Sequence, residues 1–412
     1  MIRNLKENTF ISIIFLGCLQ PFVSPELFSI FGYLYIIVLV INNHFKVSIC
    51  KNSSIKVLFL IFLIGLVVGI LNIYSRAYLR DLYYFLNPIV FLLIGLNITD
   101  NYNSYKRLLN SIVAISIIVS LISMAQMIIG VGVFGQLASL RAYFDNVIWG
   151  NVFSIGIILA MWDEKTLFEK HKKLCFSFLL LVSFLGLSRT VWIEVIVIIT
   201  VVLMADKNKA KSIAKLLMIS SLAILLVVIS LQFIPEAQLN LILDKIGNTS
   251  SEISSEDRWT SVSVIQNNWR GYEMYCAESQ FKNGSLLEQL LGGGFGTGIK
   301  VGRVAALVGQ PGEYIYVIHN GFYGMLVKEG IIGVILYICF YLLLIKDSLK
   351  RIFRTKHKLD GLILGITVCL MIYTYLVKGI FSDFVQVNAL LAIGGWIKYK
   401  NCSNNQMIGR RL

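Results

Sequence analysis

Four histidines occur in the chain, and one of them stands where a proton transfer could take place. His319 and Asn320 open a long apolar run, whereas the other three lie in basic polar segments and are interpreted as solvated: His44, His171 and His357. A neutral imidazole accepts a proton near pH 7, and the start of a helix presents free N–H groups to an anion. His319 is therefore the candidate for a proton transfer in which the imidazole acts as the base.

A set of arginines is expected on the same face as His319. Because guanidinium groups bind phosphate oxygens in bidentate fashion, several around one cleft would hold a pyrophosphate. The candidate residues for binding pyrophosphate or substrate are Arg189, Arg258, Arg141, Arg80 and Asn320. For Arg80 and its neighbour Arg76, a position beside lipid headgroups explains the charge equally well.

The composition defines the elements that must position these side chains. The 412 residues are 57% hydrophobic and only 15% charged, which excludes an ordinary soluble enzyme. The sequence predicts an all-α polytopic membrane protein with about 12 transmembrane helices. The apolar runs are Thr9–Phe22, Leu27–Ile41, Ile55–Leu71, Leu82–Leu96, Leu108–Ile129, Val147–Met161, Leu174–Leu187, Val191–Ala205, Ile213–Phe233, Ile318–Ile345, Leu362–Val377 and Phe384–Ile397.

The basic residues indicate how these helices are oriented. The net charge of +14 could suggest a nucleic-acid partner, but in a membrane protein its distribution matters more than its sum. With the N-terminus placed inside, 25 of the 37 Lys and Arg fall in cytoplasmic segments, so both termini are predicted to be cytoplasmic. The first run lacks a signal-peptide cleavage site and is interpreted as a retained helix.

One connection is far longer than the others and divides the chain. The predicted organisation is nine helices in residues 1–233, an external loop or cap in 234–317, and three helices with a cytoplasmic tail in 318–412. A loop of this length is expected to be a small folded unit, with a helix around Arg258–Asn268 and a glycine turn at Gly292–Gly298. Cys276 is the one cysteine predicted to lie outside, which excludes an internal disulfide there. No residue cluster suggests a metal, so no metal or other cofactor is expected.

Several other ionisable groups fall near or within the predicted bilayer. Glu194, Lys328 and Glu329 could be functional or could pair with other helices, and the sequence does not decide between these interpretations. Gly330 and Gly333 are expected to let helices pack closely. Lys378 and Asp383 are predicted to form a local ion pair.

The order and spacing of these residues resemble a known family. His319-Asn320 followed by Gly330-x-x-Gly333 resembles the signature of the O-antigen ligase and O-antigen polymerase superfamily of bacterial inner-membrane glycosyltransferases. The resemblance extends over about residues 140–345. It includes three further motifs, which are Ser188-Arg189, Arg258-Trp259 and Gly292-Gly293-Gly294-Phe295-Gly296.

The resemblance implies a metal-independent glycosyltransferase of the C type, with a large periplasmic loop before helix 10. His319 would act as the base toward the acceptor hydroxyl, while Arg189 and Arg258, and less directly Arg141, would neutralise the departing pyrophosphate. The implied partners are an undecaprenyl-pyrophosphate-linked oligosaccharide, membrane lipids, a chain-length-determinant protein and a flippase, with no nucleic acid. The implied location is the bacterial inner membrane, with the active site facing the periplasm.

The residues leave more than one reaction open. The Ile-, Asn-, Lys- and Phe-rich composition favours an O-antigen polymerase. However, the polymerase pattern of Arg with Gly eleven places later is missing, because Val152 and Trp269 stand there after Arg141 and Arg258. An O-antigen ligase that uses lipid A–core as acceptor is the alternative. A flippase for the same lipid-linked sugar and a protein O-glycosylating transferase are further alternatives.

Overall fold

The computed structural model describes residues 2–43, 52–130, 142–145, 147–206, 259, 261–308 and 312–408. The helices of its bundle are α1 (Ile2–Leu19), α2 (Pro25–Asn42), α3 (Ser53–Val68), α4 (Arg76–Ile98), α5 (Tyr102–Gly130), α7 (Ile148–Ala160), α8 (Lys172–Leu185), α9 (Arg189–Met204), α15 (Gly321–Thr355), α16 (Lys358–Leu376) and α17 (Val387–Ile408). Short 3-10 turns join or precede some of them: η1 (Gln20–Phe22), η2 (Gly69–Asn72) and η3 (Glu169–His171).

These helices overlap eleven of the twelve predicted apolar runs, and the ninth run, Ile213–Phe233, lies outside the described residues. Among the described residues, six helices are long and apolar enough to cross a membrane, and the apolar segments Thr9–Phe22 and Ile148–Ala160 are shorter. The chain is therefore an all-α, multi-pass membrane protein, while the number of twelve spans stays a prediction.

Small residues let the helices approach closely. α17 packs along α4, and a Cβ atom on Gly95 or Gly394 would overlap a backbone carbonyl of the facing helix. Close backbone contact of this kind is typical of helix pairs in membranes. α16 packs against both α9 and α15, and α15 also packs against α3.

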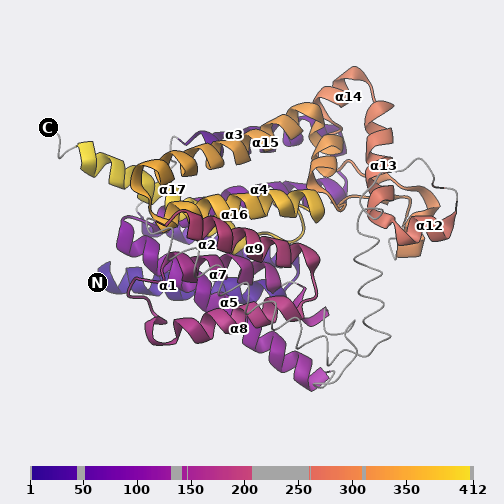
Figure 1. Cartoon of the computed structure of the whole chain (residues 1–412). Helices are drawn as coiled ribbons and strands as arrows, with labels where there is room; N and C mark the ends of the chain where they lie inside the picture. The colour runs from indigo at the N-terminus through magenta and orange to yellow at the C-terminus, as the bar shows by residue number, and fades with distance from the viewer. Residues whose placement is uncertain are drawn as a thin grey trace.

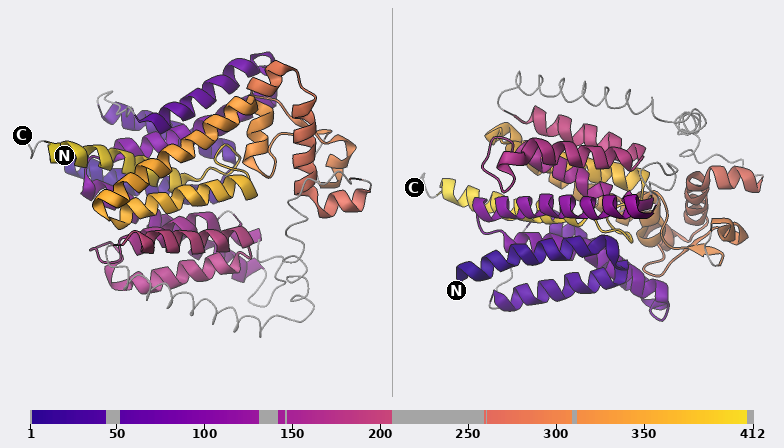
Figure 2. Two further views of the ribbon diagram at one scale, coloured as in Figure 1. Left: turned by 45° about the horizontal axis from the view of Figure 1, so that its top comes forward. Right: turned by 90° about the horizontal axis from the view of Figure 1, so that it is seen from below.

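A folded cap lies beyond one end of the bundle, opposite to the end where the two termini lie (Figure 1, Figure 2). It contains α12 (Val262–Asn267), α13 (Trp269–Lys282), α14 (Leu286–Leu291), the 3-10 turn η4 (Gly302–Val308) and two short strands, β1 (Ile299–Lys300) and β2 (Tyr314–Ile315). The strands pair antiparallel with Ile299 opposite Ile315. A hydrophobic cluster separate from the bundle core joins the cap to the start of α15, and it consists of Ala277, Ile299, Val301, Ala305, Ile315, Ile318 and Val327.

The cap differs in detail from the sequence-based prediction. In the described part of the predicted helix 258–268, only Val262–Asn267 is helical, and α13 and α14 were not predicted. The glycine turn is confirmed, since Gly292, Gly294 and Gly296 all have positive φ angles, between 71° and 85°.

The accessibility of cysteines in the cap should report which side of the membrane it faces. Lys282 is well exposed on α13, whereas Cys276 is half-buried and burial raises the pKa of its thiol. Because the thiolate is the reactive form, a raised pKa lowers its fraction near neutral pH. A membrane-impermeant maleimide should label a Lys282→Cys variant several times faster than it labels Cys276. Labelling of this variant should occur in sealed right-side-out vesicles and not in sealed inverted vesicles. Labelling of that variant from the cytoplasmic side alone would contradict the predicted orientation.

Candidate functional site

His319 lies in the turn that joins β2 of the cap to α15 of the bundle, and Asn320 holds this turn in place. Asn320 has a φ angle of 77°, and its side-chain oxygen caps α15 by accepting the N–H groups of Phe322 and Tyr323. Its backbone N–H donates to the carbonyl oxygen of Val377 over 2.8 Å. Asn320 is buried, and its amide nitrogen lies 3.3 Å from Met274 Sδ. These contacts favour a positioning role for Asn320, and its predicted role in substrate binding stays a prediction.

The side chain of His319 is paired with a buried carboxylate from the cap. Glu273 Oε2 lies 2.9 Å from His319 Nδ1 and also accepts the backbone N–H of His319 over 2.8 Å. Glu273 Oε1 accepts the indole N–H of Trp269 over 2.6 Å. Glu273 is 3% exposed, whereas the His319 side chain is 32% exposed.

This geometry determines which ring nitrogen of His319 can act as a base. A carboxylate beside Nδ1 favours the tautomer with the proton on Nδ1, which leaves Nε2 as the acceptor. The same carboxylate stabilises the imidazolium that forms once Nε2 has taken a proton. Glu273 was missed in the sequence because 46 residues separate it from His319. The available signal was a carboxylate one helical turn after Trp269, in the segment that was predicted to be external.

Arg80 is the predicted arginine that the structure brings next to this turn. Its guanidinium lies 4.5 Å from the centre of the Tyr316 ring, three residues before His319. Two of its nitrogen atoms, Nε and Nη2, are shielded from solvent and have no hydrogen-bond partner among the described residues. A guanidinium stacked on an aromatic ring is held in place while its N–H groups can still bind a ligand.

Arg189 begins α9 at the same end of the bundle as His319. α9 and α16 are antiparallel, since Cys369 Sγ donates to the carbonyl oxygen of Glu194 and Gly361 lies against Ala205. α16 ends next to Val377, the residue that accepts the N–H of Asn320. The first turn of α9 therefore lies toward the cap, as the sequence predicted for Arg189.

The other two predicted arginines, Arg141 and Arg258, lie outside the described residues. Trp259, which follows Arg258 in the sequence, packs edge-on against Tyr272 with ring centres 5.2 Å apart. Tyr272 precedes Glu273 on α13, so the residue after Arg258 contacts the helix that carries the partner of His319.

The glycine turn joins the cap to the bundle. The N–H groups of Gly293 and Gly294 donate to the carbonyls of residues 327 and 328 on α15, and the N–H of Gly296 donates to Asp81. The N–H of Phe295 donates to α3, and its ring is fully buried. Because these N–H groups are satisfied by the protein itself, the turn serves to position the cap.

Beside the glycine turn, α15 is broken at Gly330 and carries a buried ion pair. Gly330 has φ 63° and ψ −164°, and a Cβ atom there would overlap the backbone of Leu290 in α14. Gly330 therefore breaks the helix and allows α14 to pack against α15, in addition to the close packing that was predicted.

Lys328 on α15 forms a buried ion pair with α4. Its Nζ lies 2.5 Å from Asp81 Oδ2, which confirms the structural alternative for Lys328. The predicted pair of Lys378 and Asp383 is confirmed at 2.8 Å.

Removing the charge of Lys328 should destabilise the protein strongly. A Lys328→Met variant leaves Asp81 charged and buried, so the free energy of unfolding should fall by about 3–5 kcal/mol. The double variant Asp81→Asn/Lys328→Met should recover most of this loss, because the amide oxygen of the substituted side chain can still accept the N–H of Gly296. Thermal unfolding in detergent tests both, and a single variant as stable as the double variant would contradict the assignment.

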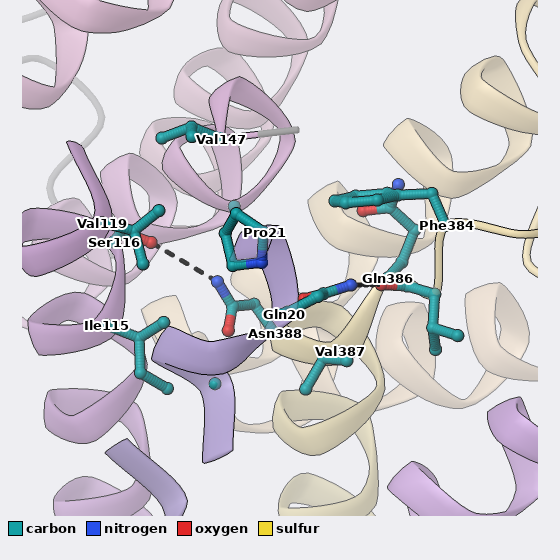
Figure 3. A pocket seen from close by; sticks show the side chains of 13 residues that line it. Gln20, Pro21, Ile115, Ser116, Val119, Val147, Phe384, Gln386, Val387 and Asn388 are labelled. Carbon is teal, nitrogen blue, oxygen red and sulfur yellow. Dashed lines mark hydrogen bonds between the residues drawn. The ribbon is translucent and has the colours of Figure 1, made fainter. Parts of the chain in front are cut away.

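Two other features of the bundle are less informative about chemistry. Glu194 and Glu329 are buried, and none of their carboxylate oxygens has a hydrogen-bond partner among the described residues. A cavity of about 30 Å³ lies among Gln20, Ser116 and Asn388 (Figure 3). It can hold about one water molecule, which is too little space for a sugar ring.

Within the described ranges, no three His, Cys, Asp or Glu side chains gather where they could hold a metal ion. The absence of a metal requirement stays a prediction.

The fold and the site together define a multi-pass helical membrane protein with a candidate acid–base pair between its cap and its bundle. Residues 174–338, which include Arg189, Glu273 and His319, match the family model described as O-Antigen ligase. The match covers 165 of the 412 residues, and it confirms the resemblance to the O-antigen polymerase and ligase superfamily. Members of this family are glycosyltransferase-like enzymes that act on lipid-linked oligosaccharides. No curated protein matches the chain.

Proposed function

We propose that this protein is an O-antigen polymerase. It transfers the growing glycan from undecaprenyl pyrophosphate to a lipid-linked repeat unit at the periplasmic face of the inner membrane. The observation that carries the proposal is the contact between His319 Nδ1 and the buried Glu273, within the segment that matches the family. This pair is suited to deprotonating an alcohol, which is the nucleophile that glycan transfer requires.

In the proposed reaction, a hydroxyl of the acceptor sugar attacks the anomeric carbon of the donor glycan. His319 Nε2 takes the hydroxyl proton as the new C–O bond forms. The bond between the anomeric carbon and the pyrophosphate oxygen breaks, and its electron pair leaves with the pyrophosphate. Attack from the opposite face inverts the anomeric configuration.

The leaving pyrophosphate needs positive charge more than it needs a strong acid. Arg80 and Arg189 lie at the cap end of the bundle, and Arg80 has two guanidinium nitrogens without partners among the described residues. We assign these two, together with Arg258 and Arg141, to binding the pyrophosphate. This assignment requires no metal ion.

An O-antigen ligase is the second candidate, and the family match supports it as well as it supports the polymerase. The ligase would use the same base and the same leaving group, with lipid A–core as the acceptor. The difference lies in the acceptor that enters beside His319, so the two candidates share every step described above.

Analysis of surface glycans from a strain that lacks the gene separates these functions. Loss of long chains, with a single repeat unit still attached to lipid A–core, supports the polymerase. Loss of all attachment supports the ligase. Lipid-linked repeats trapped on the cytoplasmic side would instead indicate a flippase and overturn both proposals.

An assay with purified protein tests the metal-free mechanism directly. The protein is incubated with lipid-linked repeat units in the presence and absence of a chelator. Equal extension in both samples is expected, whereas extension that is lost with the chelator and restored by added metal would contradict the proposed mechanism.

A further inference from the structure

Two short segments at the cap end of the bundle expose large apolar side chains. One is η2 with the turn that follows it, where Leu71 is 91% exposed and Tyr74 is fully exposed. The other is α14, where Leu286 is 75% and Leu287 is 66% exposed. We call these residues the apolar edge, which consists of Ile70, Leu71, Ile73, Tyr74, Leu286, Leu287 and Leu290.

The glycine turn brings the two segments together. The amide nitrogen of Asn72 in η2 donates to the carbonyl oxygen of Phe295 over 3.1 Å. On the other side, the backbone of Leu290 in α14 lies against Gly330 at the break of α15. The edge therefore sits where α3 and the long part of α15 reach the cap, and Figure 1 shows α14 beside the ends of both helices.

The apolar edge continues the exposed apolar surfaces of these two helices. On α3 the exposed residues include Leu60, Leu63 and Val67, and η2 follows α3 directly. On α15 they include Ile331, Ile335 and Leu342, which begin one residue after the break. In a multi-pass membrane protein, apolar surfaces of this kind face lipid, so the surface of the edge is an extension of the lipid-facing surface.

We propose that the apolar edge lies in the lipid layer, at its boundary with water, and holds the cap against the membrane. The partner is phospholipid of the bilayer leaflet on the cap's side. α14 is amphipathic, since its leucines occupy one side and Glu288 and Gln289 the other. Tyr74 is followed closely by Arg76, and this combination of aromatic and basic residues is typical of the level of lipid headgroups.

This placement has a consequence for the site. α4 begins at Arg76, directly after the edge, and Arg80 lies one helical turn further, about 6 Å along the axis. An edge anchored at the boundary therefore holds Arg80 about 6 Å deeper than Arg76, just below the level of the lipid headgroups. The anchoring does not depend on which glycan reaction the protein performs.

Photocrosslinking in nanodiscs tests the proposal. p-Benzoylphenylalanine is introduced in the full-length chain at position 71, at position 287, or at position 300 as the control. Lys300 is exposed on β1 of the cap and is not part of the edge. The nanodiscs contain phosphatidylethanolamine and phosphatidylglycerol and no lipid-linked glycan, so any lipid adduct comes from the bilayer.

At positions 71 and 287, the yield of phospholipid adducts is expected to exceed that at position 300 by about tenfold, the preference of one large apolar side chain for lipid. Equal yields at the three positions, or adducts mainly to a second copy of the protein, would overturn the proposal. The unfolding temperature of each variant is compared with that of the parent, so that a misfolded variant is excluded. If position 287 is disturbed, position 71 provides an independent test.

Discussion

Replacing His319 with Ala is expected to lower the rate of glycan transfer by about 10²–10⁴-fold, the usual contribution of a general base. The acceptor hydroxyl would have no group to take its proton, while the arginines and the acceptor contacts would remain. Binding of the lipid-linked donor should therefore change little. The measurement is the initial rate of chain extension by purified protein, together with the affinity for the donor.

The matched control is His171→Ala, which removes an exposed imidazole from a segment predicted to be cytoplasmic. This variant should retain full activity. The His319→Ala variant should also keep the parental unfolding temperature within a few degrees, because the buried Glu273 still accepts the backbone N–H of residue 319 and the indole N–H of Trp269. Parental activity in a well-folded His319→Ala variant would remove the basis of the proposed mechanism.

The bundle could be predicted from the sequence because the bilayer imposes a length and a composition on each helix. Apolar runs therefore locate helices such as α4 and α16 closely, although their ends differ by several residues. Lys378 and Asp383 could be paired because only four residues separate them. Gly292–Gly296 could be assigned to a turn because clustered glycines favour positive φ angles.

The parts that escaped prediction depend on contacts between distant segments. Nothing local in the sequence pairs Asp81 with Lys328, because the two residues come from helices far apart in the chain. Gly330 was predicted to allow close helix packing. The helix that packs against it, α14, was not predicted. Glu273 belongs to the same class, since its role becomes visible only when α13 is placed against the turn before α15.

A Glu273→Gln variant is expected to lose about 10²-fold or more of the transfer rate, because the uncharged amide no longer stabilises the imidazolium of His319. The carboxylate accepts three N–H groups, two from His319 and one from Trp269. An amide offers one oxygen and one NH₂, so one of these donors must face another donor, which should also cost about 1–3 kcal/mol of stability.

The double variant Trp269→Phe/Glu273→Gln separates the two effects. The Phe side chain has no N–H group. The amide of the substituted residue 273 can therefore direct its oxygen to His319 and its NH₂ toward the ring that replaces the indole. Stability should recover in large part, while the transfer rate should stay low because the negative charge is still missing. If the rate recovered together with stability, Glu273 would act only by holding the cap to the bundle. A persistent rate defect in a stable double variant would show that Glu273 positions His319 and stabilises its imidazolium form.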